Sequence, residues 1–135
     1  EDLCRAEVRF ANRQRGAGAR VLLDYHLSRL GIGSQTIHGY QVEEYAHLGV
    51  AVAVASGKSD CGLGIAAAAQ ALELDFVPLY EERYDLVIPS QYYVSPLLAP
   101  LLQRLLDKDF RQAVAAMPGY SVAKMGDLVA EVGSL

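Results

Sequence analysis

The sequence predicts an α/β fold, with a mostly parallel sheet flanked by helices. Short runs of β-like residues alternate along the chain with longer runs of helical periodicity, and this alternation favours a layered α/β architecture. Several glycines stand where a strand would lead into a helix or where a helix would end. No repeat, low-complexity tract or Gly/Pro/Ser-rich linker divides the 135 residues, so we expect one domain.

The first half of the chain is predicted to supply two strands and two helices. Residues 7–11 are β-like and form the first predicted strand. A polar, glycine-containing turn then leads into a helix over 19–30, whose apolar residues fit one broad helical face, and Gly31 stands in the position of a C-cap. A short strand is predicted over 37–42, followed by a helix of small apolar residues over 44–56.

The middle of the chain is predicted to complete the sheet. A glycine-containing apolar run at 59–65 predicts a buried strand, and the alanine-rich residues 66–72 predict a closely packed helix. Two more strands are predicted over 74–79 and 83–88, each ending at or near a proline. Parallel pairing through right-handed crossovers is expected for the first four strands.

The last third of the chain is predicted to be helical. Leucines recur at i, i+3 and i+4 over 95–106, and both Pro96 and Pro100 suit a first helical turn, so the helix begins at one or the other. A last helix is predicted over 109–117, where a Pro-Gly pair follows.

Composition excludes several classes of protein. With 12 basic and 16 acidic residues the formal net charge is −4, which argues against broad nucleic-acid binding but leaves room for a small basic pocket. The two cysteines cannot form a disulfide framework, and no Cys/His cluster suits zinc, so we expect no metal site. No signal peptide and no apolar run of ~20 residues is present, so we expect a cytoplasmic protein without membrane contact. Because the chain begins at Glu1 rather than Met, we expect a fragment.

The most informative segment, residues 12–20, links the first predicted strand to the first helix and contains a Gly-x-Gly sequence. Glycines allow close approach of the backbone to a ligand, and the free N–H groups and dipole of a helix start favour an anion. Bidentate donors suited to oxyanions come from Arg13, Arg15 and Arg20. The alternative is a tight turn with solvated arginines. The segment is neither a Walker A loop nor a dinucleotide fingerprint.

Three further segments contain residues that could carry chemistry, but their signals are weaker. Tyr45 and His47 could donate to a ligand at the second helix start; alternatively, Glu44 caps that helix and His47 is a surface residue. Cys61 would be a nucleophile only beside a base, and none is identifiable, so a buried structural cysteine is favoured. The acids and arginine within 81–85 fit a solvated turn better than a catalytic site. No catalytic triad, carboxylate pair or metalloprotease motif is present, so the motifs favour a binding module over an enzyme.

Taken together, these segments resemble a periplasmic-binding-protein-like domain. Residues 12–24, NRQRGAGARVLLD, are similar to its N-R-Q-x-G-S/A-G-T-R-x-L-L-D segment. Residues 44–51 and 54–64 resemble its T/S-H-x-A-V-A-x-A-V-A-S-G-x-A-D-x-G-x-G segment, and residues 76–89 its F-I-P-L-x-x-E-R-Y-D-L-V-I-P segment. The resemblance runs from about 9 to 120 in the same order and spacing.

The resemblance implies a type II two-lobe fold with the ligand held between the lobes. Such domains are found fused to molybdopterin molybdenumtransferase or to a helix-turn-helix segment, and they are similar to molybdate- and tungstate-binding proteins. It implies that residues 1–135 are a fragment of this domain, with about 9–84 forming the second lobe and 85–135 returning to the first lobe. The opening βαβ units of the first lobe would then lie upstream.

The resemblance also implies a set of ligand contacts, of which Tyr45 and His47 would face the others from the second helix. The contacts at the first helix start would be Arg13, Gly16, Gly18, Ala19 and Arg20. Family members often carry Thr where this chain has Ala19, so backbone N–H groups and arginines would have to hold the ligand without that hydroxyl.

The expected function is therefore non-catalytic binding of molybdate, tungstate or a molybdopterin-linked ligand, in association with molybdenum cofactor biosynthesis. Lobe closure around the oxyanion would need no covalently bound cofactor. The expected partners are this small ligand and an upstream domain of the same protein, without nucleic acid. The alternative is a protein-interaction or oligomerisation module, such as a homodimer, because the leucines of 97–106 would form an exposed apolar patch. An enzyme acting on a phosphorylated molecule through Cys61 or His47 is the least favoured hypothesis.

Overall fold

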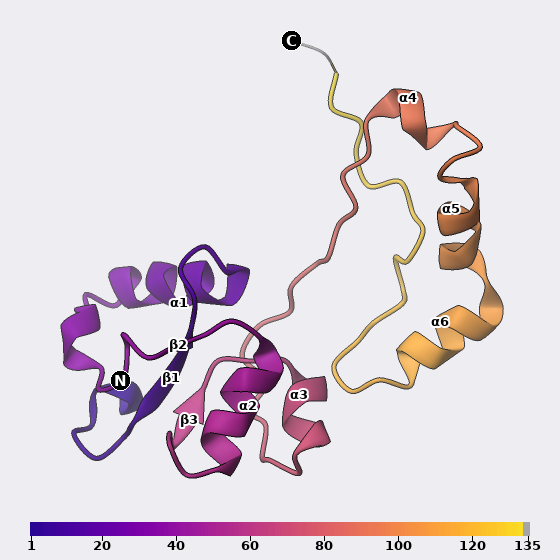
Figure 1. Cartoon of the computed structure of the whole chain (residues 1–135). Helices are drawn as coiled ribbons and strands as arrows, with labels where there is room; N and C mark the ends of the chain where they lie inside the picture. The colour runs from indigo at the N-terminus through magenta and orange to yellow at the C-terminus, as the bar shows by residue number, and fades with distance from the viewer. Residues whose placement is uncertain (134–135) are drawn as a thin grey trace. The chain divides into compact units, whose positions relative to one another are not determined.

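The computed structural model describes residues 1–133, which form two compact units (Figure 1). The first unit is Glu1–Pro78 and the second begins at Leu79. Residues 134 and 135, the last two of the predicted return segment, lie outside the described residues.

The first unit is built on a three-stranded sheet in the order β2-β1-β3, with both pairings parallel. Its strands are β1 (Phe10–Arg13), β2 (Glu43–Glu44) and β3 (Cys61–Gly62). Helices connect the strands and flank the sheet (Figure 1). The predicted α/β class with a parallel sheet is confirmed.

The central strand β1 is buried on both faces because alternate residues point to opposite sides of a strand. On one face lies α1 (Gly18–Arg29), in a cluster of Phe10, Leu23, Leu27 and Ile37. On the other lies α2 (His47–Ala55), in a cluster of Ala11, Val50 and Ala53. Phe10 and Ala11 are almost inaccessible to solvent.

Small residues let α2 approach the sheet closely. A Cβ atom added to Gly62 would collide with the side chain of Val50 and would lie 2.8 Å from the carbonyl oxygen of Ala11. The alanine-rich helix α3 (Ala66–Ala71) packs beside α2, as expected for the predicted helix over 66–72. β3 is only half-buried, so the expectation of a buried strand within 59–65 is corrected.

The first strand lies further along the chain than the predicted 7–11, because two polar residues belong to it. Asn12 and Arg13, assigned to a turn from the sequence, are buried in β1. The backbone N–H of Asn12 donates to the carbonyl of Val42, and the side-chain Nδ2 of Asn12 donates to the carbonyl of Tyr40 at 2.9 Å. Satisfied hydrogen bonds therefore allow polar residues where the pattern favours apolar ones.

The strand predicted over 37–42 is wrong. The chain there follows β1 but bulges away from it, after the short 3₁₀ helix η2 (Ser34–Thr36). The backbone N–H of Phe10 donates to the carbonyl of residue 38, and that of Asn12 donates to the carbonyl of residue 42. A step of two residues along β1 is therefore matched by a step of four residues along the segment. Gly39 makes the bulge: its φ is +91°, and a Cβ there would collide with the carbonyl oxygen of Phe10.

The C-terminus of α1 matches its prediction. Gly31 adopts a φ of +67° and donates to the carbonyl of Ser28, while Ile32 donates to that of Leu27 at 2.9 Å. This pair of bonds is the Schellman arrangement that glycine favours at a helix end.

The strands predicted over 74–79 and 83–88 are wrong. Within the described chain neither segment pairs with another strand, and residues 74–89 adopt no regular secondary structure. Their side chains are largely exposed, Tyr84 and Val87 each to 95%. Strand propensity expresses fit to a sheet surface, so a β-like sequence without a sheet beside it does not form a strand.

The described part of the second unit, up to residue 133, contains three short helices, and none of their residues is buried. They are α4 (Ser90–Tyr93), α5 (Ala99–Leu106) and α6 (Lys108–Ala115). α5 begins at Ala99 and has Pro100 in its first turn, which agrees with one of the two predicted helix starts. No helix within residues 1–133 is long and apolar enough to cross a membrane.

At the edge of the sheet where β1 begins, Arg9 and Asp60 form a two-pronged ion pair. The Arg9 guanidinium donates to both carboxylate oxygens, at 2.7 and 2.9 Å, and its backbone N–H donates at 2.8 Å. These hydrogen bonds, the side-chain bond first, lower the pKa of Asp60 to about 2.

We predict that acid weakens the first unit through Asp60. Its folded pKa lies below the ordinary value of 3.8, so its stabilisation is present above about pH 4 and is lost as pH falls towards 2. The free energy of unfolding, measured with urea between pH 4.5 and 2, should fall more steeply in the wild type than in Asp60→Asn. Asp75→Asn, which removes an exposed carboxylate, should keep the wild-type slope. Equal slopes in all three proteins would contradict the prediction.

Candidate functional site

The candidate site lies at the edge of the sheet where β1 and β2 end. These two strands are parallel neighbours, with Asn12 opposite Glu43 in their register. β1 leads through residues 14–17 into α1, and β2 leads through residues 45–46 into α2. Two helix N-termini therefore follow strands that end at the same edge, which is where ligands bind in open α/β sheets.

Neither helix N-terminus is capped by a side chain. The N-cap residues are Ala17 for α1 and Ala46 for α2, and alanine carries no acceptor. Ser, Thr, Asp and Asn are the residues that usually accept a hydrogen bond from the first-turn N–H groups. Those N–H groups and the helix dipoles favour an anion at this edge.

The glycines of the predicted ligand set shape the turn before α1. Gly16 adopts a φ of +87°, and no other atom lies within 4 Å of the place where a Cβ would stand. Gly18 is the first residue of α1 and Ala19 the second. The turn is therefore open on its outer side.

Arg13 is buried and fastens the connection between β2 and α2. Its guanidinium donates to the carbonyl of Glu44 at 3.1 Å and to that of Tyr45 at 3.2 Å. It also donates to the side-chain oxygen of Gln14 at 3.1 Å. The side chain thus fixes the path of the backbone that leads into α2.

Arg20 is 3% exposed, and its charge is balanced by groups from several segments. Its Nη1 donates to the carbonyl of Arg13 at 3.0 Å and lies 3.4 Å from a carboxylate oxygen of Glu43. Its Nε lies 3.4 Å from the carboxylate of Asp24. The guanidinium stacks over the ring of Tyr40, 4.1 Å from its centre, and the Tyr40 hydroxyl donates to Asp24 at 2.6 Å.

Arg15 differs from the other two arginines because it is exposed. Its side chain is 80% accessible, and its Nε lies 3.9 Å from Glu43. Arg15 thus has the most accessible guanidinium of the three arginines at this edge. The ligand contacts implied by the resemblance omit Arg15 and Glu43, although the sequence pattern includes Arg15 among the arginines suited to an oxyanion. Their signal in the sequence was position, directly before a helix and at the end of a strand.

The remaining predicted ligand residues lie at the start of α2. Tyr45 is 77% exposed and His47 is the half-buried first residue of the helix. The structure thus brings all seven predicted residues to the same edge of the sheet, and their role as ligand contacts stays a prediction.

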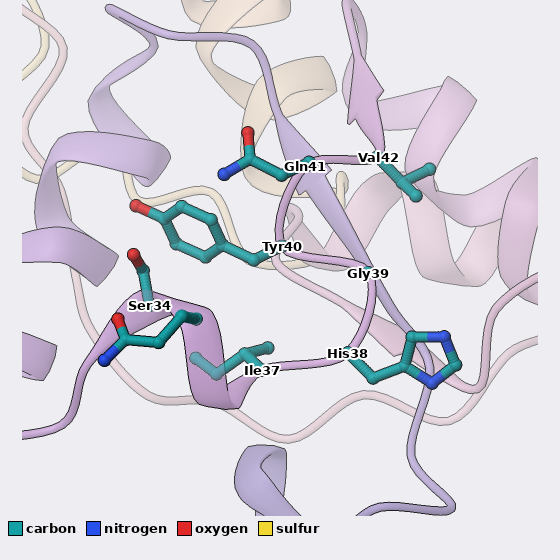
Figure 2. Close-up of a pocket in the computed structure, with 8 residues that line it drawn as sticks. Ser34, Ile37, His38, Gly39, Tyr40, Gln41 and Val42 are labelled. Carbon is teal, nitrogen blue, oxygen red and sulfur yellow. The ribbon is translucent and has the colours of Figure 1, made fainter.

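A separate cavity of about 540 Å³ lies along the bulged segment, and Figure 2 shows the residues that line it. They include Ser34, Tyr40 and Gln41, and none of the seven predicted ligand residues. A second cavity, of about 420 Å³, shares Ser34 and Tyr40 and is bounded on one side by Asp24 of α1. Sequence patterns missed the first because an irregular segment forms it, and the second because that segment meets residues of α1 only in the folded chain.

The structure supports a structural interpretation of Cys61. Burial, and to a lesser extent the charge of Asp60, raise the pKa of the Cys61 thiol, which keeps it protonated and weakly nucleophilic. Within residues 1–133, no three His, Cys, Asp or Glu side chains are grouped so as to hold a metal ion.

Comparisons with known proteins give one family and two relatives. A family model described as a PBP superfamily domain matches residues 1–106. YvgK of Bacillus subtilis (strain 168), described as uncharacterized, is 35% identical over 131 residues, which are 97% of this chain and 42% of YvgK. A Clostridium pasteurianum protein, described as uncharacterized and encoded in the 5′ region of the ferredoxin 2Fe-2S gene, is 34% identical over 113 residues, 83% of this chain and all of that protein. No solved structure matches the chain.

We predict that Arg20 contributes to stability far more than Arg15. Arg20→Ala leaves the carboxylates of Asp24 and Glu43 without a buried cation and should lower the free energy of unfolding by about 3 kcal/mol. Arg15→Ala removes a solvated side chain and should change it by less than about 0.5 kcal/mol. Urea denaturation of both variants measures the difference, and similar losses in the two would contradict this assignment.

Proposed function

The chain belongs to the PBP superfamily, and from that premise we propose that its first unit is a non-catalytic binding domain for a small oxyanion. The observation that carries the proposal is the pair of helix N-termini at one sheet edge, both with alanine as the N-cap residue. A bound anion would accept hydrogen bonds from N–H groups that a capping side chain would otherwise occupy.

The arginines have different parts in this proposal. Arg13 and Arg20 hold the two strand-to-helix connections in place through the contacts described above. Arg15, exposed beside the turn at Gly16, is free to reach a ligand in solution. Because Ala19 offers no hydroxyl, backbone N–H groups and the guanidinium of Arg15 would supply the hydrogen bonds.

The choice of ligand rests on the resemblance of the segments at 12–24, 44–64 and 76–89. Their likeness to molybdate- and tungstate-binding domains favours a tetrahedral oxyanion of this kind, free or linked to a pterin. A place in molybdenum cofactor biosynthesis, in the cytoplasm, is part of the same proposal. The chain spans 42% of YvgK, so a longer protein of this kind has room for the upstream domain that the proposal includes.

We predict that the chain binds molybdate and tungstate more tightly than sulfate or phosphate. Isothermal titration at low ionic strength should give dissociation constants in the micromolar range for molybdate. Arg15→Ala should weaken binding at least tenfold, because loss of a charge-assisted hydrogen bond of about 1.5–3 kcal/mol corresponds to a factor of about 10 to 150. Arg29→Ala, at the far end of α1, serves as the control and should bind as the wild type does. If none of the four anions binds, the proposed function is contradicted.

The second unit favours a second candidate function, protein interaction. Its helices α5 and α6 carry one apolar face each, yet none of their residues is buried. Leu97 is 75% exposed and Leu106 is 65% exposed. Apolar surface of this kind marks contact with another domain or chain, and we propose self-association as its simplest form.

We predict that the chain forms a homodimer at micromolar concentration. Light scattering should give twice the chain mass for the wild type and a single chain mass for the double variant Leu97→Asp, Leu101→Asp. Leu30→Asp places the same charge on an exposed leucine of the first unit and should leave the dimer intact. A monomeric wild type would count against self-association.

A further inference from the structure

Glu43 places a carboxylate between two arginines at the sheet edge: Arg15, the proposed ligand donor, and Arg20, which holds the connection from β1 to α1. Its Oε1 lies 3.4 Å from Nη1 of Arg20 and 3.9 Å from Nε of Arg15. The side chain is 26% exposed, so it is neither locked in the core nor fully solvated. Glu43 belongs to β2, which ends beside the end of β1. Its carboxylate therefore lies at the same sheet edge as the uncapped N-termini of α1 and α2.

Arg20 does not depend on Glu43 alone. It retains the carbonyl of Arg13, the carboxylate of Asp24 and the ring of Tyr40 when Glu43 is set aside. Arg15, which is exposed, can leave Glu43 without exposing any buried group. The carboxylate is therefore removable without dismantling the cluster around Arg20.

From these contacts we propose that the carboxylate of Glu43 occupies the anion site when no ligand is bound. We call it the resident anion, and an incoming oxyanion must displace it. The inference rests on the proposed function and adds a residue that sets its affinity. A carboxylate and an oxyanion use the same guanidinium donors, and two anions a few ångströms apart repel each other. The ligand therefore binds only the fraction of molecules in which Glu43 has withdrawn, and its measured affinity falls by that fraction.

The neighbouring Glu44 has other partners and provides a comparison. Its Oε1 lies 3.8 Å from Nζ of Lys58. Its Oε2 would be 2.9 Å from a Cβ added to Gly49, so the carboxylate lies against α2. Removing its charge alters the local field but releases no arginine.

The test compares Glu43→Gln with the wild type in titrations with molybdate, sulfate and phosphate. The glutamine keeps the size of the side chain and removes its charge, and molybdate should bind at least tenfold more tightly. Glu44→Gln should give a smaller gain, below about threefold, because a charge is lost without freeing an arginine. Glu7→Gln, which breaks the remote pair with Arg5, should change nothing. Thermal unfolding establishes that each variant is folded, and Glu43→Asp, with its shorter carboxylate, should lie between wild type and Glu43→Gln.

The outcomes separate this inference from the proposed function. If the wild type binds and Glu43→Gln binds equally or less tightly, the resident-anion role is overturned and oxyanion binding stands. If only Glu43→Gln binds, the resident-anion role is supported, and the wild type is shown to be no oxyanion receptor under these conditions. A gain in Glu44→Gln equal to that in Glu43→Gln overturns the role, because it shows a general field effect. If neither the wild type nor Glu43→Gln binds any of the three anions, both proposals are overturned.

Discussion

The burial of one charged side chain organises the first unit. A guanidinium removed from water must be balanced by neighbouring groups, since an unpaired buried charge is strongly destabilising. Arg20 meets this requirement with contacts from its own helix, from the carbonyl end of β1, from the bulged segment and from β2. Each of these segments is thereby held where the sheet edge and the helix starts meet.

The candidate site follows from that arrangement. Arg13 fixes the backbone that enters α2, and the turn at Gly16 leaves the approach to α1 open. Alanine at both N-caps leaves the first-turn N–H groups without a capping side chain. Glu43 places a carboxylate at this edge, 3.4 Å from Nη1 of Arg20.

The second unit shows the opposite condition, in which strong sequence patterns lack a surface to pack on. Its helices have clear apolar faces, but none of their residues is buried. Residues 74–89, which span the boundary between the two units, have strand-like composition, but no strand within residues 1–133 pairs with them. Local anchors remain, such as Asp107, which accepts a hydrogen bond from the N–H of Phe110 at 2.9 Å, and Arg111, which donates to the carbonyl of Val122 at 2.9 Å. They hold short turns together without creating a core.

The sequence by itself determined the helices with clear periodicity and the glycine end of α1, because each depends on contacts between near neighbours in the chain. It also indicated the α/β class and the parallel sheet, because strand-like and helical segments alternate and a strand–helix–strand connection favours parallel pairing. The resemblance to a periplasmic-binding-protein-like domain led to the seven residues at the sheet edge. Only the tertiary structure decided that Asn12 and Arg13 belong to a buried strand. In the same way it decided that a bulge at Gly39 replaces the strand predicted over 37–42, and that residues 83–88 form no strand. It also decided that Arg20 is enclosed, that Arg15 is accessible and that Glu43 joins them. Strand pairing and charge burial depend on partners distant in sequence, and no local pattern specifies those partners.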